Sequence, residues 1–362
     1  MTQPAVLATK PEDYRRFGIT TEIQPFEDGL RTDPARSGHY EWWYFDAHLD
    51  DGSTLVVTFY TKDFAAPSGG LAPMITIDLD LPDGRTINKR AVYDPATFSS
   101  SSEGCDVRID GHRFVGDLHE YRITATVDEV SVDVTLTGQT EPWRPATGHI
   151  VYGEDSAQVF AWLPAVPHGA AEVTYIVDGT STTTAGHGYH DHNWGNAPLL
   201  SVVNNWYWGR GAAGPYTFIT AQIISEKKYG YGPITVFMLA KDGRVVADDQ
   251  SKVTFDKSDL HADPMMHKPV AQVHSYTYDD GTDRYELSYR RSDTLLRTPF
   301  IDAVHGVKRI AARLVGFDGC YLRFGGTIDV TAVHNGARTT LTEDAIWELM
   351  YFGRHGHEGT GG

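Results

Sequence analysis

The sequence contains very little cysteine. Its two cysteines, Cys105 and Cys320, lie far apart in a chain of 362 residues and show no CxxC or zinc-finger spacing. Such a pair provides no disulfide framework and is typical of a reducing compartment. Residues 1–17 contain prolines and charges but no apolar core, so we expect no signal peptide and a cytoplasmic protein.

Long apolar runs and an excess of positive charge are also absent. No window approaches the roughly 18 apolar residues that a membrane-spanning helix needs, so we expect no integral membrane segment. The formal net charge is −17, which argues against nucleic acid as a partner. The chain also lacks a phosphate-binding loop, a Gly-x-Ser-x-Gly elbow and a dinucleotide fingerprint in a strand-to-helix setting.

Strand patterns separated by tight turns dominate what the sequence does contain. Hydrophobic residues make up 41% of the chain and aromatic residues 12%, which is ample for globular cores. Asp51-Gly52 and seven later pairs of the same type separate β-branched runs and supply the positive φ of hairpin turns. Antiparallel meanders of this kind close into barrels or sandwiches, so we predict an all-β fold. One short helix is predicted at 304–315.

Two domains are expected, because the chain exceeds what one core usually fills. We place an irregular N-terminal arm at 1–36, a first β-barrel at 37–185 and a second at 186–362. An echo supports two halves, since Trp43-Tyr44-Phe45 and Trp206-Tyr207-Trp208 recur at an offset of 163 residues. An aromatic hairpin then opens each barrel.

The stretch 186–195 is the first candidate for chemistry. It holds three histidines, an aspartate, a tyrosine and a tryptophan between flanking glycines. As a strand it places His190, His192 and Trp194 on one face and Tyr189 and Asp191 on the other. The plain alternative is that the histidines are exposed and the tryptophan is core. The clustering favours a site.

Two further aromatic stretches accompany it. In the first, Glu41 stands beside Trp42 and Trp43, where partial desolvation would raise the pKa of its carboxyl; a salt bridge to an arginine is the alternative. In the second, 204–210, indoles and a guanidinium share one strand face. Together these patches indicate an oily cavity with a few polar groups, which is the usual composition of a small-molecule site.

Metal binding is a competing interpretation. His190 with His192, or His187 with Asp191, could hold zinc from one strand face. Each pair needs a third ligand that the sequence does not identify, so we expect no metal.

At these residues the chain resembles the lipocalin-like carotenoid 1,2-hydratase (hydroxyneurosporene synthase) superfamily, which includes kievitone-hydratase-like enzymes and lipocalin-type Diels–Alderases. The resemblance spans roughly 38–352 and rests on the residues at 41–45, 188–195 and 319–326. It implies two successive lipocalin-like antiparallel β-barrels, a hydrophobic small-molecule substrate and no cofactor.

The resemblance also implies roles for single residues. A histidine and a tryptophan two residues apart correspond to His192 and Trp194. A tyrosine and an aspartate are expected on a following strand, where Tyr216 is present but no aspartate follows it. Either Asp191 or Glu41 then supplies the acid, or this protein does not hydrate its substrate.

Three functional hypotheses follow. The first is acid–base chemistry on carbon–carbon double bonds of an isoprenoid or polyene, with a carboxylic acid protonating the alkene, indoles stabilising the cation and a histidine activating water. The second is a pericyclic cyclase in natural-product biosynthesis. The third is a carrier of lipophilic ligands. The predicted catalytic residues are Asp191, His192, His190, Glu41 and Trp194, and the predicted substrate-binding residues are Tyr189, Trp43, Tyr44, Asn205, Trp206, Trp208, Arg210 and Tyr216.

Overall fold

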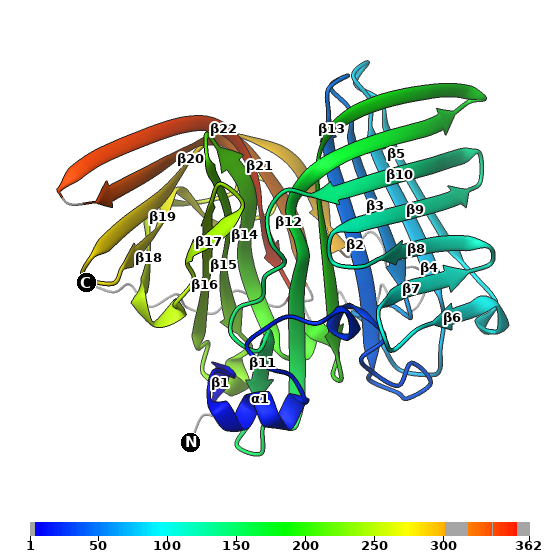
Figure 1. Ribbon diagram of the computed structural model, residues 1–362, viewed down its shortest axis with the longest axis horizontal. Helices are drawn as coiled ribbons and strands as arrows, with labels where there is room; N and C mark the ends of the chain where they lie inside the picture. Colours follow the sequence, from blue (N-terminus) through cyan, green and yellow to red (C-terminus); the bar gives the residue numbers. More distant parts are fainter. Residues whose placement is uncertain (1–3, 301–317, 335, 353–362) are drawn as a thin grey trace. The chain divides into compact units, whose positions relative to one another are not determined.

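The computed structural model describes residues 4–300, 318–334 and 336–352. Strands dominate this part of the chain, and the predicted all-β fold is confirmed as two curled antiparallel sheets (Figure 1). The chain divides into two compact units. One consists of Leu7–Val151 with Ser156–Pro198, and the other contains the chain from Leu199 onward with short segments up to Val6 and at Tyr152–Asp155. Within the described ranges, no helix is long and apolar enough to cross a membrane.

The first sheet has the order β5-β4-β3-β2-β13-β12-β10-β9-β8-β7-β6, and a short strand pair, β1 with β11, extends it beside β12. The sheet curls so that β2–β5 lie across β6–β10 (Figure 1). Its strands are β1 Ala5–Leu7, β2 Tyr40–Leu49, β3 Thr54–Tyr60, β4 Met74–Asp80, β5 Thr86–Val92, β6 Phe98–Ser100, β7 Cys105–Ile109, β8 His112–Gly116, β9 Glu120–Val127, β10 Val130–Gly138, β11 His149–Tyr152, β12 Gln158–Val177 and β13 Thr180–Gly195.

Alternation of apolar and polar residues explains the curl of this sheet. In β9, Tyr121, Ile123 and Ala125 are buried while the residues between them lie at or near the surface. The buried set from all these strands forms one apolar cluster inside the curl. The hairpin predicted between β2 and β3 is also present, with Gly52 at φ 88° in its turn. Only one face of each strand therefore meets the core.

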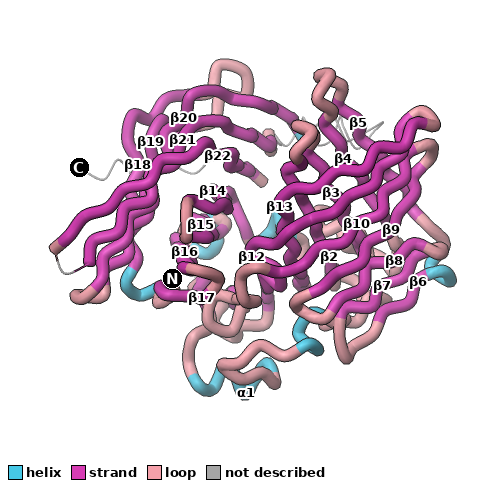
Figure 2. The backbone as a smooth tube through the Cα atoms, turned by 45° about the horizontal axis from the view of Figure 1, so that its top comes forward, coloured by secondary structure: helices cyan, strands magenta, loops and turns pink. Residues whose placement is uncertain are grey.

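The second sheet has the order β17-β16-β15-β14-β22-β21-β20-β19-β18. Figure 2 shows its long strands bending along their length. Its core is rich in aromatic rings, including Tyr207, Tyr276, Tyr289 and Trp347. The strands are β14 Val203–Ala213, β15 Tyr216–Ser225, β16 Pro233–Lys241, β17 Arg244–Ala247, β18 Val253–Ala262, β19 Pro269–Asp279, β20 Asp283–Pro299, β21 Cys320–His334 and β22 Ala337–Tyr351.

The internal echo does not extend to side-chain orientation. Trp43 is fully buried in the first core. Its counterpart Trp206 is only partly buried, and it is the next residue, Tyr207, that enters the second core. The two aromatic strands therefore present opposite faces at matched positions, since successive side chains alternate.

Helical structure differs from the prediction. One α-helix, α1 (Pro11–Phe17), occurs among the described residues, and it lies in the arm that we expected to be irregular. Pro11 stands at its first position and Gly18 ends it in the left-handed conformation at φ 68°, which are ordinary helix boundaries. The helix predicted at 304–315 lies outside the described residues. The part of the chain that the structure describes also contains five short 3-10 turns: η1 Pro25–Asp28, η2 Pro95–Thr97, η3 Leu199–Ser201, η4 Lys227–Tyr229 and η5 Gln250–Lys252.

The extents of two strands, β12 and β13, also differ from what the sequence indicates. β12 is one strand, where the sequence indicates two, because the prolines at 164 and 167 coincide with register irregularities between Leu163 and Gly169. Bulges tolerate proline because the ladder is locally interrupted there. β13 continues without a break through residue 186, where our division of the chain begins the second barrel. Residues 186–195 therefore belong to the first sheet, because they pair with β2 and β12.

Candidate active site

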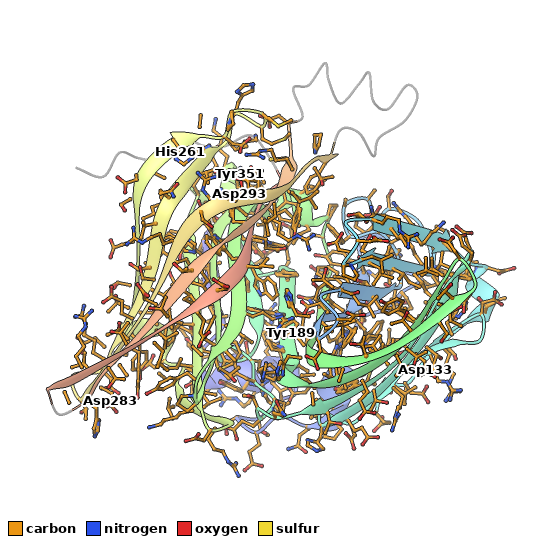
Figure 3. The ribbon with its side chains drawn as sticks, turned by 90° about the horizontal axis from the view of Figure 1, so that it is seen from above. Asp133, Tyr189, His261, Asp283, Asp293 and Tyr351 are labelled. Atoms are coloured by element: carbon orange, nitrogen blue, oxygen red, sulfur yellow. The ribbon has the colours of Figure 1, made fainter. Side chains whose placement is uncertain are left out.

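β13 lies between β2 and β12, and its side chains divide between two faces of the first sheet. The register places His190 opposite Phe45 and His192 opposite Trp43, on the face that meets the apolar core. The alternate residues Tyr189, Asp191 and Asn193 project from the other face. Tyr189, which lies on this other face, is labelled in Figure 3. The alternation inferred for β13 is therefore observed, and it separates Asp191 from the two histidines.

Glu41 and His192 form a buried pair on the core face. The Glu41 carboxylate accepts a hydrogen bond from His192 Nε2 at 2.9 Å, and neither side chain is exposed. It also accepts the backbone N–H of Arg31, at 2.9 and 3.0 Å to its two oxygens, and that of Thr32. These donors occupy both carboxylate oxygens. Glu41 is thus held by the N-terminal arm and by an imidazole, in place of the arginine side chain considered above.

Asp28 is a second buried acid on this face, and it comes from the arm. Tyr121 donates its hydroxyl to Asp28 Oδ2 at 2.5 Å, and His190 Nε2 lies 3.2 Å from the same oxygen. Burial works to raise the pKa of Asp28, but His190, His192 and the Tyr121 hydroxyl outweigh it and hold that pKa below its usual value. The core of the first sheet therefore contains a polar network of two acids and two histidines.

Two of the four tryptophans predicted for the site pack against this network. The Trp43 ring stacks on His192 with centroids 4.6 Å apart and an angle of 11° between the rings, and its Nε1 donates to the Asp28 backbone carbonyl at 3.0 Å. The Trp194 ring lies 4.7 Å from His192 and 5.4 Å from His149. The structure thus brings together His190, His192, Trp194, Glu41 and Trp43, but as densely packed interior side chains.

Asp191 is the centre of the opposite face. Its Oδ2 accepts hydrogen bonds from the Tyr189 hydroxyl and from Trp162 Nε1, both at 2.7 Å, and its Oδ1 accepts one from Asn193 Nδ2 at 2.7 Å. Burial raises the pKa of Asp191 to about 6, and the three donors only partly oppose this effect. A carboxyl with such a pKa exists in both protonation states near neutral pH, as a general acid requires.

A second tyrosine–aspartate pair lies beside it on β2. Tyr44 donates its hydroxyl to Asp46 Oδ2 at 3.0 Å. In the register, Tyr44 is opposite Asp191 and Asp46 is opposite Tyr189, so tyrosine and aspartate alternate across the two strands. The Tyr44 and Tyr189 rings are 6.3 Å apart. Of the predicted residues, this face therefore brings together Asp191, Tyr189 and Tyr44.

Gly188 allows β13 to pack closely at this point. A Cβ at Gly188 would lie 2.9 Å from the Leu136 side chain and 3.0 Å from the Phe45 ring. Both distances are shorter than ordinary carbon contacts, so any larger residue would displace the strand from its neighbours. The glycine beside the histidine cluster thus serves close packing.

The other predicted substrate-binding residues lie in the second unit. Trp206 and Trp208 share the face of β14 that points away from its core, and Trp206 Nε1 donates to Glu348 Oε1 at 3.0 Å. Asn205 is buried and donates to Asn204 Oδ1 at 2.8 Å. Tyr216 pairs with Ala213 at the far end of β14, so the sheet does not bring it close to Trp206. Arg210 is partly buried on the same face as the two tryptophans.

Sequence reasoning missed Asp28, Tyr121 and Trp162. Trp162 lies in a predicted strand, and its pairing with Asn193 of β13 is visible only once β12 and β13 are in register. Asp28 lies in a segment without periodicity, 162 residues before its partner His190. The potential metal ligands that cluster within the described residues are Asp28, Cys105 and His190, and this group contains neither of the pairs considered for zinc, His190 with His192 and His187 with Asp191.

Comparison with known proteins gives a family for most of this chain. Residues 28–294 match the Diels-Alderase-like family model. A hydroxyneurosporene dehydrogenase of Chlorobaculum tepidum is 29% identical over 48% of this chain and 53% of its own length. The quinolone epoxide rearrangement protein asqO of Emericella nidulans is 28% identical over 59% of this chain and 63% of its own length. An acyclic carotenoid 1,2-hydratase of Rubrivivax gelatinosus is 24% identical over 54% of this chain and 51% of its own length.

The matched regions therefore span about half to two thirds of these relatives. A solved structure, that of CghA, superposes with a TM-score of 0.60 at 15% identity and covers 88% of this chain and 90% of its own. At that identity the likeness concerns the fold. The resemblance recognised in the sequence is confirmed by the family model and by the carotenoid hydratase among the relatives.

Proposed function

This chain belongs to the Diels-Alderase-like family, and we propose that it is an enzyme that acts by acid–base chemistry on carbon–carbon double bonds of a large hydrophobic isoprenoid or polyene, adding water across one of them. The names of its relatives describe a hydratase, an epoxide rearrangement protein and a dehydrogenase. The first two fit chemistry that begins with proton transfer to an apolar substrate. Family membership by itself leaves the reaction open.

The observation that carries the proposal is the environment of Asp191. Its carboxyl is buried, its pKa is raised to about 6, and Tyr189, Trp162 and Asn193 fix both oxygens. Protonating an alkene is difficult, so the acid must be shielded from water and close to its protonated form. Asp191 combines both properties, and its three partners hold it in one orientation.

Glu41 is the weaker candidate for the acid. It is fully buried, and its two oxygens already accept hydrogen bonds from His192 and from backbone N–H groups of the arm. Unlike Asp191, it lies on the core face beside His192, whose ring packs against the Trp43 and Trp194 rings, and a substrate would have to displace these side chains to reach it. We therefore assign Glu41, His190 and His192 to the support of the sheet that carries Asp191, and we assign proton donation to Asp191.

The Tyr189, Tyr44 and Trp162 rings complete this site in the proposal. Trp162 Nε1 also donates to the Tyr189 hydroxyl at 3.2 Å, so the indole orients both groups. Aromatic faces stabilise a carbocation by roughly 0.5–2 kcal/mol each. These rings would stabilise the cation that proton transfer creates, while the tryptophans of β14 remain predicted substrate contacts.

Cyclisation is the second candidate, and the family name favours it. A pericyclic step requires a pocket that folds a polyene and hydrogen bonds that polarise it. Trp162, Tyr189 and Asn193 would supply such bonds by turning their donors from Asp191 to the substrate. In that case the reaction would not depend on the protonation of Asp191.

The test is turnover of an acyclic carotenoid and of linear polyenes in ¹⁸O-labelled water. Hydration predicts a product one water heavier that carries the label, with turnover falling as pH rises through about 6. Asp191→Asn should lower turnover by about 10²–10⁴-fold. The control Asp133→Asn changes an exposed aspartate on β10 of the same sheet (Figure 3) and should leave turnover unchanged.

The other outcomes separate the alternatives. An isomeric, unlabelled product with pH-independent turnover would replace hydration with cyclisation. A ligand that binds tightly and returns unchanged would indicate a carrier. Full turnover in Asp191→Asn would remove Asp191 as the acid. Glu41→Gln should reduce the yield of folded protein and leave the turnover of the folded fraction near that of the wild type.

A further inference from the structure

We propose that the interior of the first sheet contains a binding site for a divalent transition metal, with zinc as the expected ion, formed by Asp28, Cys105 and His190. One potential ligand atom from each of these buried residues lies within 4.8 Å of the others. They come from η1 in the arm, from β7 and from β13. This site lies on the core face of β13, so the inference is independent of the proposed role of Asp191.

The orientation of His190 supports metal coordination. Its Nδ1 lies 2.8 Å from the backbone carbonyl oxygen of Tyr44. A carbonyl oxygen can only accept, so Nδ1 carries the proton and donates it. Nε2, 3.2 Å from Asp28 Oδ2, would lose its proton on metal binding and present its lone pair to the ion. Metal-binding histidines are usually held in this way, by a hydrogen bond from the opposite ring nitrogen to a carbonyl or carboxylate.

The Asp28 carboxylate provides a second, independent observation. Asp28 is only 1% exposed, and its Oδ1 accepts no hydrogen bond. A buried anionic oxygen without a donor is costly, and most such oxygens in proteins have one. His192 Nδ1 lies 3.6 Å from Oδ1, beyond hydrogen-bond distance. A bound cation would satisfy this oxygen.

The chemistry of the three ligands selects the ion. A thiolate and an imidazole favour zinc or cobalt over magnesium and calcium, which prefer oxygen ligands. Cys105 must lose its proton to bind, after which its charge and that of Asp28 balance a divalent cation. Three protein ligands leave one position of a tetrahedral ion for a small ligand such as water.

Tyr121 would act outside the coordination sphere. Its hydroxyl donates to Asp28 Oδ2 and accepts the backbone N–H of Leu118 at 3.1 Å, which fixes the orientation of the carboxylate. Removing such an outer partner typically lowers metal affinity by about 10–100-fold. Tyr121→Phe is therefore a graded test that leaves all three ligands in place.

The chain offers a matched control for the thiol. Cys320 is the second cysteine, and it too is free and buried, but it lies on β21 of the second sheet. Wild type, Cys320→Ser, Cys105→Ser and His190→Gln would each be expressed in zinc-supplemented medium and desalted. Their metal content is then measured by mass spectrometry. We expect about one zinc per chain in the first two proteins and at least a tenfold loss in the last two.

Cobalt substitution tests the site in the wild-type protein, so its result does not depend on whether a ligand variant folds correctly. Wild-type protein loaded with Co²⁺ should show a thiolate-to-cobalt charge-transfer band that persists in Cys320→Ser. Wild-type protein that retains no zinc and shows no such band would overturn the proposal. So would full zinc content in a correctly folded Cys105→Ser, since the metal would then be bound elsewhere. In either case hydrogen bonds, including one from His190 to Asp28, would hold the buried polar network together without a metal ion.

Discussion

Asp191 has opposite expected effects on stability and on catalysis. Burial raises the pKa of its carboxyl from 3.8 to about 6, so the folded protein binds the Asp191 proton more tightly than the unfolded chain does. Folding stability must then fall as pH rises from about 4 to about 6, and it stays reduced above that range. The group that makes the acid useful near neutral pH therefore weakens the fold there.

Asp191→Asn should relieve this cost. A shift of about two pKa units corresponds to at most about 3 kcal/mol, and the changed contact with Asn193 will reduce the gain. We expect the variant to be more stable than the wild type at pH 7 and to lose this advantage at pH 4. Urea unfolding at the two pH values measures the difference. A variant that is equally destabilised at both would show that Asp191 is ionised at little cost in the fold.

At the scale of elements, strand alternation could be predicted from the sequence and the contribution of the arm could not. The residues of β2 and β13 that share a face were identified correctly because a strand repeats every two residues. The arm has no such period. Its Glu27 and Asp28 lie in a single 3-10 turn, and their partners include Arg144, in the connection between β10 and β11, and His190 of β13, both more than 100 residues later. Only the assembled sheet shows that these two acids are buried.

The sequence does not show which strands lie beside β13. This explains why the candidate residues, predicted as one site, separate into two groups on opposite faces of the sheet. The sequence grouped Asp191 with His190 and His192 because they are adjacent in the chain. Adjacent strand residues face opposite sides, so the structure assigns Asp191 to Trp162 and the histidines to Glu41 and Asp28. Partner strands, and not neighbours in the chain, decide what each side chain contacts.

The buried ion pair of the arm provides a test at this scale. Arg144 Nε lies 2.7 Å from Glu27 Oε2, and the two side chains are 3% and 4% exposed. Glu27→Gln leaves the Arg144 guanidinium buried without its counter-charge, which typically costs about 3–5 kcal/mol. We expect that loss in urea unfolding. Asp83→Asn, which breaks the exposed pair with Arg85, is the control and should leave stability unchanged. Similar curves for the two variants would mean that the arm adds no stability.

At the scale of the whole molecule, the two cysteines provide one reporter for each unit. Cys105 lies on β7 of the first sheet and Cys320 on β21 of the second, and both are free and buried. Burial raises the pKa of Cys320 to about 11 and raises that of Cys105 well above its usual value, the nearby charge of Asp28 adding to the effect at Cys105. Thiolates are the reactive form, so neither group should react in the metal-free native protein near pH 8.

Thiol labelling during urea unfolding should therefore follow each unit separately. Among the described residues each sheet has an apolar cluster, and that of the first sheet contains more residues. We expect Cys320 to become reactive at lower urea than Cys105, as measured by mass spectrometry of the labelled peptides. Coincident labelling of the two thiols would instead mean that the chain unfolds in a single cooperative step.

The docking of the arm has a consequence for how the protein is made. Asp28 leaves the ribosome 162 residues before His190. Until β13 has been synthesised, Asp28 lacks its histidine partner and the first sheet lacks the strand that joins β2 to β12. The nascent chain must therefore keep the arm free while the next 162 residues are added. A chaperone or a crowded polysome that captured this segment would delay closure of the first sheet, even though most of its strands had already emerged.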